Sequence, residues 1–180
     1  MTASAGRMPN FMIIGAARTG TSSLFEYMRQ HPDIYFSQIK EPMFFALEGV
    51  KPDFRGPGDD KEINRKSVTD LAAYQELFAG ATTQKAIGEA SANYLYSDRA
   101  AERIKHYVPN AKMIAVLRNP VERAYSSFLY TIRDGRESLR DFGEALAQED
   151  KRITAHWEHI WHYAHMGFYG QQLQRYYDRF

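Results

Sequence analysis

Residues 11–22 read Phe11-Met12-Ile13-Ile14-Gly15-Ala16-Ala17-Arg18-Thr19-Gly20-Thr21-Ser22, and this stretch decides the fold. Its four apolar residues predict a short buried strand, and the two glycines that follow have the spacing of a phosphate-binding P-loop. A helix that begins near Gly20 would direct free backbone N–H groups at a bound anion. The stretch therefore predicts a strand–loop–helix unit that holds a phosphate group.

The loop differs from an ATP-binding P-loop at its cationic position. Thr21 and Ser22 stand where nucleotide triphosphatases carry Lys and Ser or Thr, and the cation is instead Arg18. Without that lysine, we expect a phosphate other than the β/γ end of ATP. A strand-to-helix turn without any ligand is the alternative, and the Arg-Thr-Gly-Thr-Ser sequence disfavours it.

Apolar runs alternate with helical patterns along the chain, which predicts an α/β fold with a P-loop-like, open parallel sheet flanked by helices. We predict strands at about 11–14, 34–36, 85–88 and 112–117. Helices are predicted at about 20–30, 70–79, 98–107, 120–134, 139–149, 153–165 and 168–179.

The domain organisation is predicted from the same pattern. We expect a single domain over 1–180, with a nucleotide-binding core at 11–130 and a helical part at 131–180. Because a helical pattern runs up to Phe180, where an α/β chain would return to its sheet, we expect a C-terminal part to be missing. Residues 48–66 are polar and rich in glycine and proline, and we expect a surface excursion near an acceptor.

The composition disfavours several classes of protein. The 180 residues carry 23 basic and 22 acidic side chains, so no general affinity for nucleic acid is expected. No cysteine is present, which removes disulfides and thiolate ligands. No apolar leader occurs in the first ten residues and no run reaches membrane-spanning length, so a cytoplasmic protein without membrane contact is expected.

Four histidines at a spacing of three invite a metal site, and they are His156, His159, His162 and His165. On an α-helix this spacing drifts by about 60° per step, which would spread the four rings over half of the helix surface. We therefore expect no bound metal.

A second apolar run, at 112–117, leads directly into Arg118, Asn119 and Pro120. Asn119 can cap a helix that has Pro120 as its first residue. Four side chains then share one face of that helix: Arg123, Ser126, Ser127 and Tyr130. Arg118 and Ser126 are predicted to hold a second phosphate without metal. The alternative is that Arg118 pairs with a surface carboxylate such as Glu122.

With both segments considered, the chain resembles the sulfotransferases that use 3′-phosphoadenosine 5′-phosphosulfate (PAPS), of the heparan-sulfate and bacterial carbohydrate types. Residues 14–22, 40–45 (Lys40-Glu41-Pro42-Met43-Phe44-Phe45) and 117–126 carry the likeness, and 88–94 carries it more weakly. The resemblance implies transfer of a sulfuryl group from PAPS to a hydroxyl or amine of a small-molecule or carbohydrate acceptor.

The resemblance also implies roles for single residues. It places the 5′-phosphosulfate at Arg18, Thr19, Gly20, Thr21 and Ser22, the 3′-phosphate at Arg118 and Ser126, and the catalytic base at Glu41. Arg18, near the tip of the loop, is also the expected cation for the leaving oxygen. Many relatives carry Lys in place of Arg18, and a lysine is usual at the position of Ala90.

Two other functions stay open. The first is a truncated, non-catalytic module that binds PAPS or 3′,5′-bisphosphoadenosine. The second is a P-loop kinase, which Thr21 at the lysine position and Arg118 at the second strand end disfavour.

Overall fold

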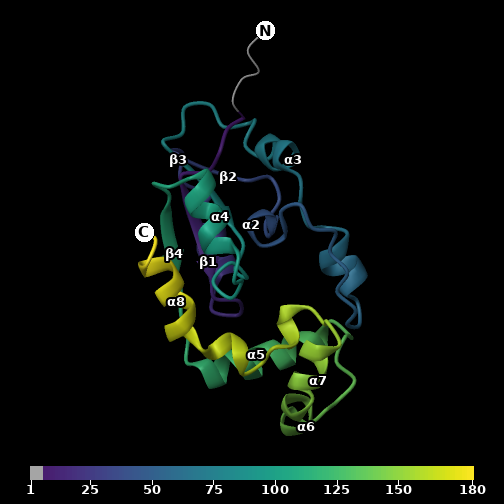
Figure 1. Cartoon of the computed structure of the whole chain (residues 1–180). Helices are drawn as coiled ribbons and strands as arrows, with labels where there is room; N and C mark the ends of the chain where they lie inside the picture. Colours follow the sequence, from purple (N-terminus) through teal and green to yellow (C-terminus); the bar gives the residue numbers. More distant parts are fainter. Residues whose placement is uncertain (1–5) are drawn as a thin grey trace.

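The computed structural model describes residues 6–180 and has a parallel sheet of four strands at its centre (Figure 1). The strands are β1 (Phe11–Gly15), β2 (Ile34–Phe36), β3 (Ala86–Ala90) and β4 (Lys112–Ala115), in the spatial order β2-β3-β1-β4. All three pairings are parallel. The predicted α/β fold with a parallel sheet is confirmed, although β3 runs two residues further than expected and β4 ends two residues earlier.

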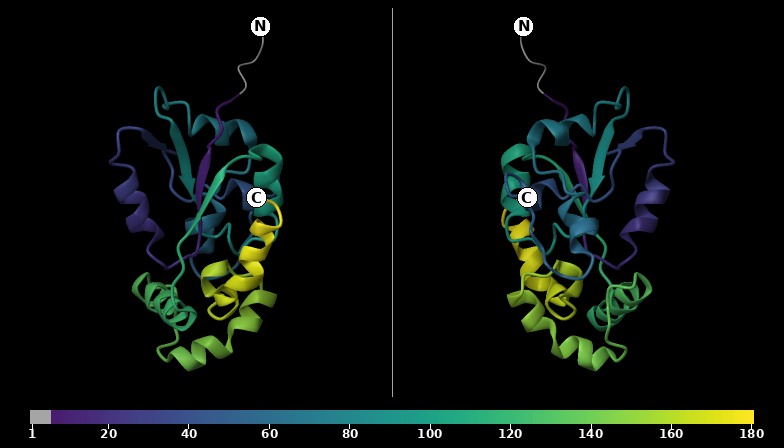
Figure 2. Two further views of the ribbon diagram at one scale, coloured as in Figure 1. Left: turned by 90° about the vertical axis from the view of Figure 1, so that its left-hand side faces the viewer. Right: turned by 90° about the vertical axis from the view of Figure 1, so that its right-hand side faces the viewer.

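The central strand β1 is buried along its whole length because helices cover both faces of the sheet. Met12 and Ile14 face one core cluster, which contains the aromatic side chains after β2, and Phe11 and Ile13 face the other, with Phe25. Figure 2 shows α1 (Thr21–Met28) on one side of the sheet and α4 (Ala100–Tyr107) on the other. The alternation of side chains along the strand thus separates the core clusters on the two faces of the sheet.

The described part of the chain contains six further α-helices. They are α2 (Phe44–Leu47), α3 (Leu71–Glu76), α5 (Pro120–Arg133), α6 (Phe142–Ala147), α7 (Glu149–Thr154) and α8 (Tyr169–Tyr177). Of these, α5, α6 and α7 lie beyond one end of the sheet (Figure 1). Short turns of π and 3₁₀ helix occur at η1 (Asp60–Asn64), η2 (His159–Trp161) and η3 (His165–Gly167). Within residues 6–180, no helix is long and apolar enough to cross a membrane.

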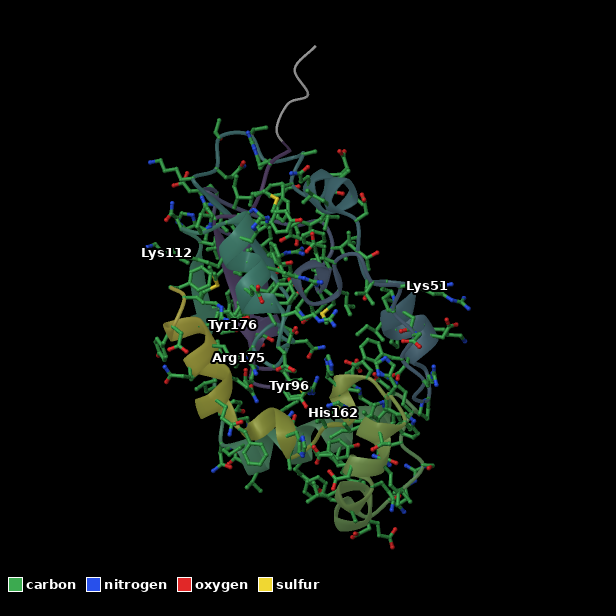
Figure 3. All side chains as sticks on the ribbon, in the orientation of Figure 1. Lys51, Tyr96, Lys112, His162, Arg175 and Tyr176 are labelled. Carbon is green, nitrogen blue, oxygen red and sulfur yellow. The ribbon has the colours of Figure 1, made fainter. Side chains whose placement is uncertain are left out.

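The last helix, α8, is fastened to the loop that follows β3 (Figure 3). The Tyr176 hydroxyl donates to the carbonyl of Tyr94 at 2.8 Å, and the Arg175 guanidinium donates to the carbonyls of Leu95 and Tyr96 at 3.0 and 2.9 Å. These bonds hold the C-terminal helix against the carboxyl end of the sheet.

Two helix predictions in the C-terminal third are wrong. The segment predicted as one helix at 139–149 begins only at Phe142, because Asp141 caps it by accepting a hydrogen bond from the N–H of Glu144 at 2.9 Å. The segment predicted as a helix at 153–165 is not α-helical beyond Thr154, since His156 adopts a left-handed conformation with φ of 59°. Such a residue ends a helix.

Candidate functional site

A cleft of about 750 Å³ opens where β1, β2 and β3 end. Ligands of open α/β sheets bind at this edge. Four of the predicted site residues line it: Arg18, Thr21, Ser22 and Glu41. The other four lie outside its lining: Thr19, Gly20, Arg118 and Ser126. The tertiary structure therefore brings the loop after β1 and the carboxylate after β2 into one cleft.

The two loop glycines are needed for different reasons. A Cβ on Gly15 would lie 2.6 Å from the Cβ of Leu95, so close packing against the loop after β3 requires the glycine. Gly20 has a φ of 100°, and a Cβ there would meet nothing within 4 Å. The backbone at Gly20 is therefore open to a ligand.

The first turn of α1 offers unpaired N–H groups beside that opening. Gly20 provides no side-chain cap, and the first turn contains no acidic residue. Thr21 is buried and Ser22 is exposed at the cleft. A helix start of this kind favours an anion.

Arg18 presents its cation over an aromatic ring. The guanidinium carbon lies 4.3 Å from the centre of the Tyr130 ring, and Arg133 lies over the same ring at 4.8 Å. The Nε of Arg18 is buried and has no hydrogen-bond partner among residues 6–180, and burial lowers the pKa of the guanidinium. A cation with an unused donor fits an anionic ligand in the cleft.

Thr19 uses its hydroxyl inside the protein. Its Oγ1 lies 2.7 Å from the carbonyl oxygen of Ala16 and 2.7 Å from that of Val116, which ties the loop to the chain beyond β4. For a ligand, Thr19 therefore has its backbone N–H to offer rather than its side chain.

Both the backbone N–H and the side-chain carboxylate of Glu41 have partners in the protein. Its N–H donates to the carbonyl of Ala90 at 2.9 Å, and its Oε2 accepts from the N–H of Ala92 at 2.8 Å. Its other oxygen, Oε1, lies 2.8 Å from the Lys40 ammonium. Glu41 thus lines the cleft and is ion-paired with Lys40. Its carboxylate is oriented by the N–H of Ala92, which follows β3.

The predicted common face of α5 is divided in the structure. Arg123 is fully buried and donates to the carbonyl of Tyr163, and Ser127 donates to the carbonyl of Ile160 at 2.9 Å. Tyr130, by contrast, lines the cleft, and Ser126 is half-buried. Residues 123, 126, 127 and 130 share one face of α5 as predicted, but Arg123 and Ser127 bond the segment at 160–163 whereas Tyr130 lines the cleft.

Arg118 lies beside Glu122 at the start of α5. Its Nε is 3.0 Å from the Glu122 carboxylate in an exposed pair. Asn119 caps α5 as predicted, by accepting from the N–H of Val121 at 3.0 Å, and Pro120 is the first helical residue. The phosphate-binding role of Arg118 and Ser126 stays a prediction.

One wall of the cleft contains residues for which no role was predicted: Asn93, Arg136 and Glu158. Arg136 forms an ion pair with Asp59, which is fully buried although it lies in the predicted surface excursion. The pKa of Glu158 is raised to about 7, because burial outweighs the opposing effect of Arg136 and Asp59 raises it further. No motif connects these residues, so no sequence signal identified them.

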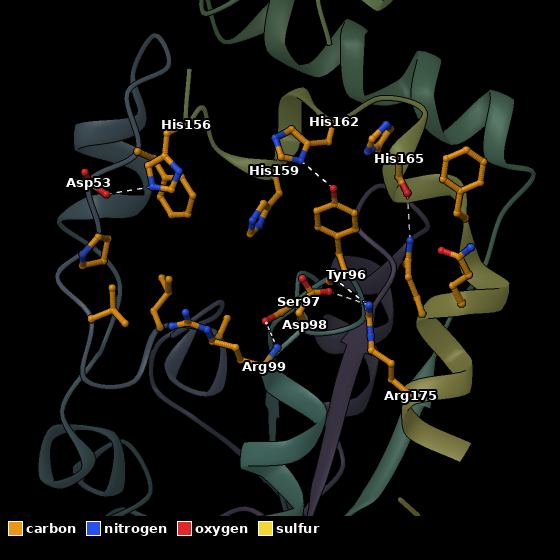
Figure 4. A pocket seen from close by; sticks show the side chains of 18 residues that line it. Asp53, Tyr96, Ser97, Asp98, Arg99, His156, His159, His162, His165 and Arg175 are labelled. Carbon is orange, nitrogen blue, oxygen red and sulfur yellow. Dashed lines mark hydrogen bonds and ion pairs between the residues drawn. The ribbon is translucent and has the colours of Figure 1, made fainter. Parts of the chain in front are cut away.

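The four histidines line a separate pocket of about 610 Å³ (Figure 4). The expected spread over a helix is wrong because the chain is not α-helical beyond Thr154, where a left-handed His156 and two separate 3₁₀ turns follow. His162 Nδ1 lies 3.0 Å from the Tyr96 hydroxyl, and burial lowers the pKa of His162 to about 3 and that of His159 to about 4. Among residues 6–180, no group of three or more histidine or acidic side chains could hold a metal ion.

Comparison with known proteins adds an independent finding. A model of the sulfotransferase family matches residues 9–178. The crystal structure of a sulfotransferase from Alicyclobacillus acidocaldarius superposes with a TM-score of 0.92 at 45% sequence identity, covering 97% of this chain and 70% of that one.

Two human relatives are similar over a shorter part of their length. Carbohydrate sulfotransferase 15 of Homo sapiens is 31% identical over 170 residues, which cover 78% of this chain and 30% of the relative. The bifunctional heparan sulfate N-deacetylase/N-sulfotransferase 3 of Homo sapiens is 31% identical over 120 residues, 67% of this chain and 13% of the relative. The chain thus spans less than a third of either relative.

Proposed function

This chain belongs to the sulfotransferase family, and from that premise we propose that it transfers a sulfuryl group from PAPS to a hydroxyl or amine of an acceptor. The observation that carries the proposal is the meeting of Arg18, the start of α1 and Glu41 in one cleft. The names of the two human relatives support a carbohydrate acceptor.

The residues of the cleft fit the anionic end of PAPS. The open backbone at Gly20, the uncapped start of α1 and the guanidinium of Arg18 are the groups that would hold the 5′-phosphosulfate. Arg118 and Ser126 are proposed for the 3′-phosphate. Arg118 would have to leave Glu122, and exposed pairs of this kind contribute at most about 1 kcal/mol. When bound, PAPS supplies the sulfuryl group and a bisphosphate leaving group.

The chain's own residues would perform the acid–base and electrostatic work. The Glu41 carboxylate would accept the proton of the acceptor hydroxyl or amine while the oxygen or nitrogen of that group forms its bond to sulfur. The Ala92 N–H, 2.8 Å from Oε2, would keep the carboxylate oriented. Arg18 would face the phosphate oxygen whose bond to sulfur breaks, and would stabilise the charge that develops there.

A transfer assay tests this proposal directly. ³⁵S-labelled PAPS is incubated with the protein and a panel of oligosaccharides, phenols and amines, and labelled products are separated from the donor. Transfer to any acceptor supports the proposal. Calorimetric binding of 3′,5′-bisphosphoadenosine without transfer would instead support the non-catalytic module, and absence of both would overturn the nucleotide site.

A further inference from the structure

Glu158 is a cleft carboxyl that the roles above do not use. It lies directly before η2 and its side chain is 9% exposed. Its Oε1 accepts from the Asn93 side-chain amide at 3.3 Å. Asn93 follows Ala92, whose N–H holds Glu41, so the carboxyl of Glu158 is connected to the segment that orients the proposed base.

The guanidinium of Arg136 lies beside Glu158 but is ion-paired with the carboxylate of Asp59. Arg136 forms a close ion pair with Asp59 and lies 3.8 Å from Glu158 Oε2, beyond hydrogen-bond distance. Two buried carboxyl groups thus share one guanidinium. Glu158 Oε2 is left with capacity to accept a hydrogen bond on the side of the cleft.

The Glu158 carboxyl does not fasten the excursion at 48–66, because Asp59 does so through the Glu158 backbone. The Asp59 carboxylate accepts from the N–H of Gly56 at 2.6 Å and from the N–H of Glu158 at 2.9 Å. Asp59 and Arg136 therefore fasten the excursion at 48–66 to the segment before η2 through the backbone of Glu158. Its carboxyl is not needed for that connection.

We propose that the Glu158 carboxyl, with the Asn93 amide beside it, is an acceptor subsite that binds a second hydroxyl of a polyhydroxylated acceptor. In this arrangement Glu41 takes the proton of the hydroxyl that is sulfated, and Glu158 Oε2 accepts from a neighbouring one. The inference rests on the proposed function, because it concerns the acceptor of the same cleft. An acceptor with a single hydroxyl would not use the subsite.

The subsite has an expected pH dependence. The side chains that face Glu158 are those of Asp59, Arg136 and Asn93. The other charged side chains that line the cleft are Arg18, Lys40, Glu41, Glu62, Arg65, Lys66 and Arg133. Burial holds the pKa of Glu158 near 7, so the carboxyl is ionised above that pH and accepts most strongly there. Binding of a polyhydroxylated acceptor should therefore strengthen as pH rises through 7.

The test compares Glu158→Gln with the matched control Glu62→Gln. Glu62 lines the same cleft but is exposed and pairs with Lys66 at 2.7 Å. Neutral cello-, malto- and chito-oligosaccharides are titrated calorimetrically into the protein loaded with 3′,5′-bisphosphoadenosine, between pH 6 and 9. Sulfate transfer to the same sugars and to 2-naphthol is measured in parallel.

We expect Glu158→Gln to weaken binding of the best sugar about tenfold above pH 8 and to remove the rise through pH 7, with bisphosphate affinity and transfer to 2-naphthol unchanged. Glu62→Gln should match wild type. Three results would overturn the subsite. Wild type and Glu158→Gln could bind the sugars equally well, or the variant could lose transfer to the sugar and to 2-naphthol equally. Wild type could also fail to bind any of the sugars. Failure of transfer alone would overturn the proposed function, since the binding measurement needs no turnover.

Discussion

The backbone N–H of Ala92 donates to the Oε2 of Glu41 at 2.8 Å, which joins the carboxylate after β2 to the first residues after β3. The same segment continues into Asn93, which contacts Glu158. Because Lys40 pairs with the remaining oxygen of Glu41, both oxygens of this cleft carboxylate have a partner that orients them. The chemistry proposed here depends on this short connection between two strand ends.

Glu41→Gln should lower kcat about 10²–10⁴-fold, because the amide keeps the size of the carboxylate but cannot take the acceptor's proton. Affinity for 3′,5′-bisphosphoadenosine should stay within a few-fold. The matched control is Glu89→Gln, since Glu89 is fully buried and burial raises its pKa well above the usual range. Steady-state transfer and calorimetry measure both effects, and a Glu41→Gln rate above about a tenth of wild type would exclude Glu41 as the base.

Arg18→Ala should reduce both bisphosphate affinity and kcat, because the guanidinium is proposed to contact the ligand before and during transfer. A charge-assisted hydrogen bond contributes about 1.5–3 kcal/mol, so affinity should fall at least tenfold. Tyr130→Phe keeps the ring 4.3 Å from Arg18 and serves as the control, with affinity close to wild type. Unchanged affinity in Arg18→Ala would contradict the assignment.

Arg118→Ala should weaken binding of 3′,5′-bisphosphoadenosine about tenfold and leave binding of AMP, which lacks the 3′-phosphate, nearly unchanged. Arg118 is exposed, so the melting temperature should change little. Glu122→Gln is the companion variant, because it releases Arg118 from its 3.0 Å pair and should strengthen bisphosphate binding slightly. Equal losses for both nucleotides in calorimetry would place the 3′-phosphate elsewhere.

His162 should make the folded state sensitive to acid. Burial lowers the pKa of this imidazole to about 3, whereas its ordinary value is 6.5, so the unfolded chain binds a proton first as pH falls. Stability should therefore decrease below pH 6.5, by up to about 1.4 kcal/mol per pH unit from this group.

His162→Asn tests that expectation, because the asparagine amide can donate to or accept from the Tyr96 hydroxyl but does not titrate. Urea unfolding between pH 7 and pH 4 should show a shallower loss of stability in the variant than in wild type, whatever its stability at pH 7. His106→Asn, on the exposed face of α4, is the control and should keep the wild-type slope. Parallel curves for wild type and His162→Asn would contradict the burial effect.

Most of the local elements and the family could be predicted from the amino-acid sequence, the helices at 139–149 and 153–165 excepted. The apolar run before Gly15, the glycine spacing and the Asn119-Pro120 start of a helix depend on neighbours in the chain, and all three appear in the structure. Burial and capping of this kind follow from short-range periodicity and backbone geometry. The single-domain organisation and the cytoplasmic location stay predictions.

Tertiary structure alone decided which side chains meet. Glu158 and Asp59 are far apart in the sequence and become buried together around Arg136. The four histidines share one pocket although their segment is not an α-helix. Even Gly15 is explained by packing against Leu95, which a local turn could not predict. Periodicity specifies which face of an element is buried, whereas contacts between distant segments depend on how those faces pack. The wall of the cleft with Asn93, Arg136 and Glu158 is built from such contacts.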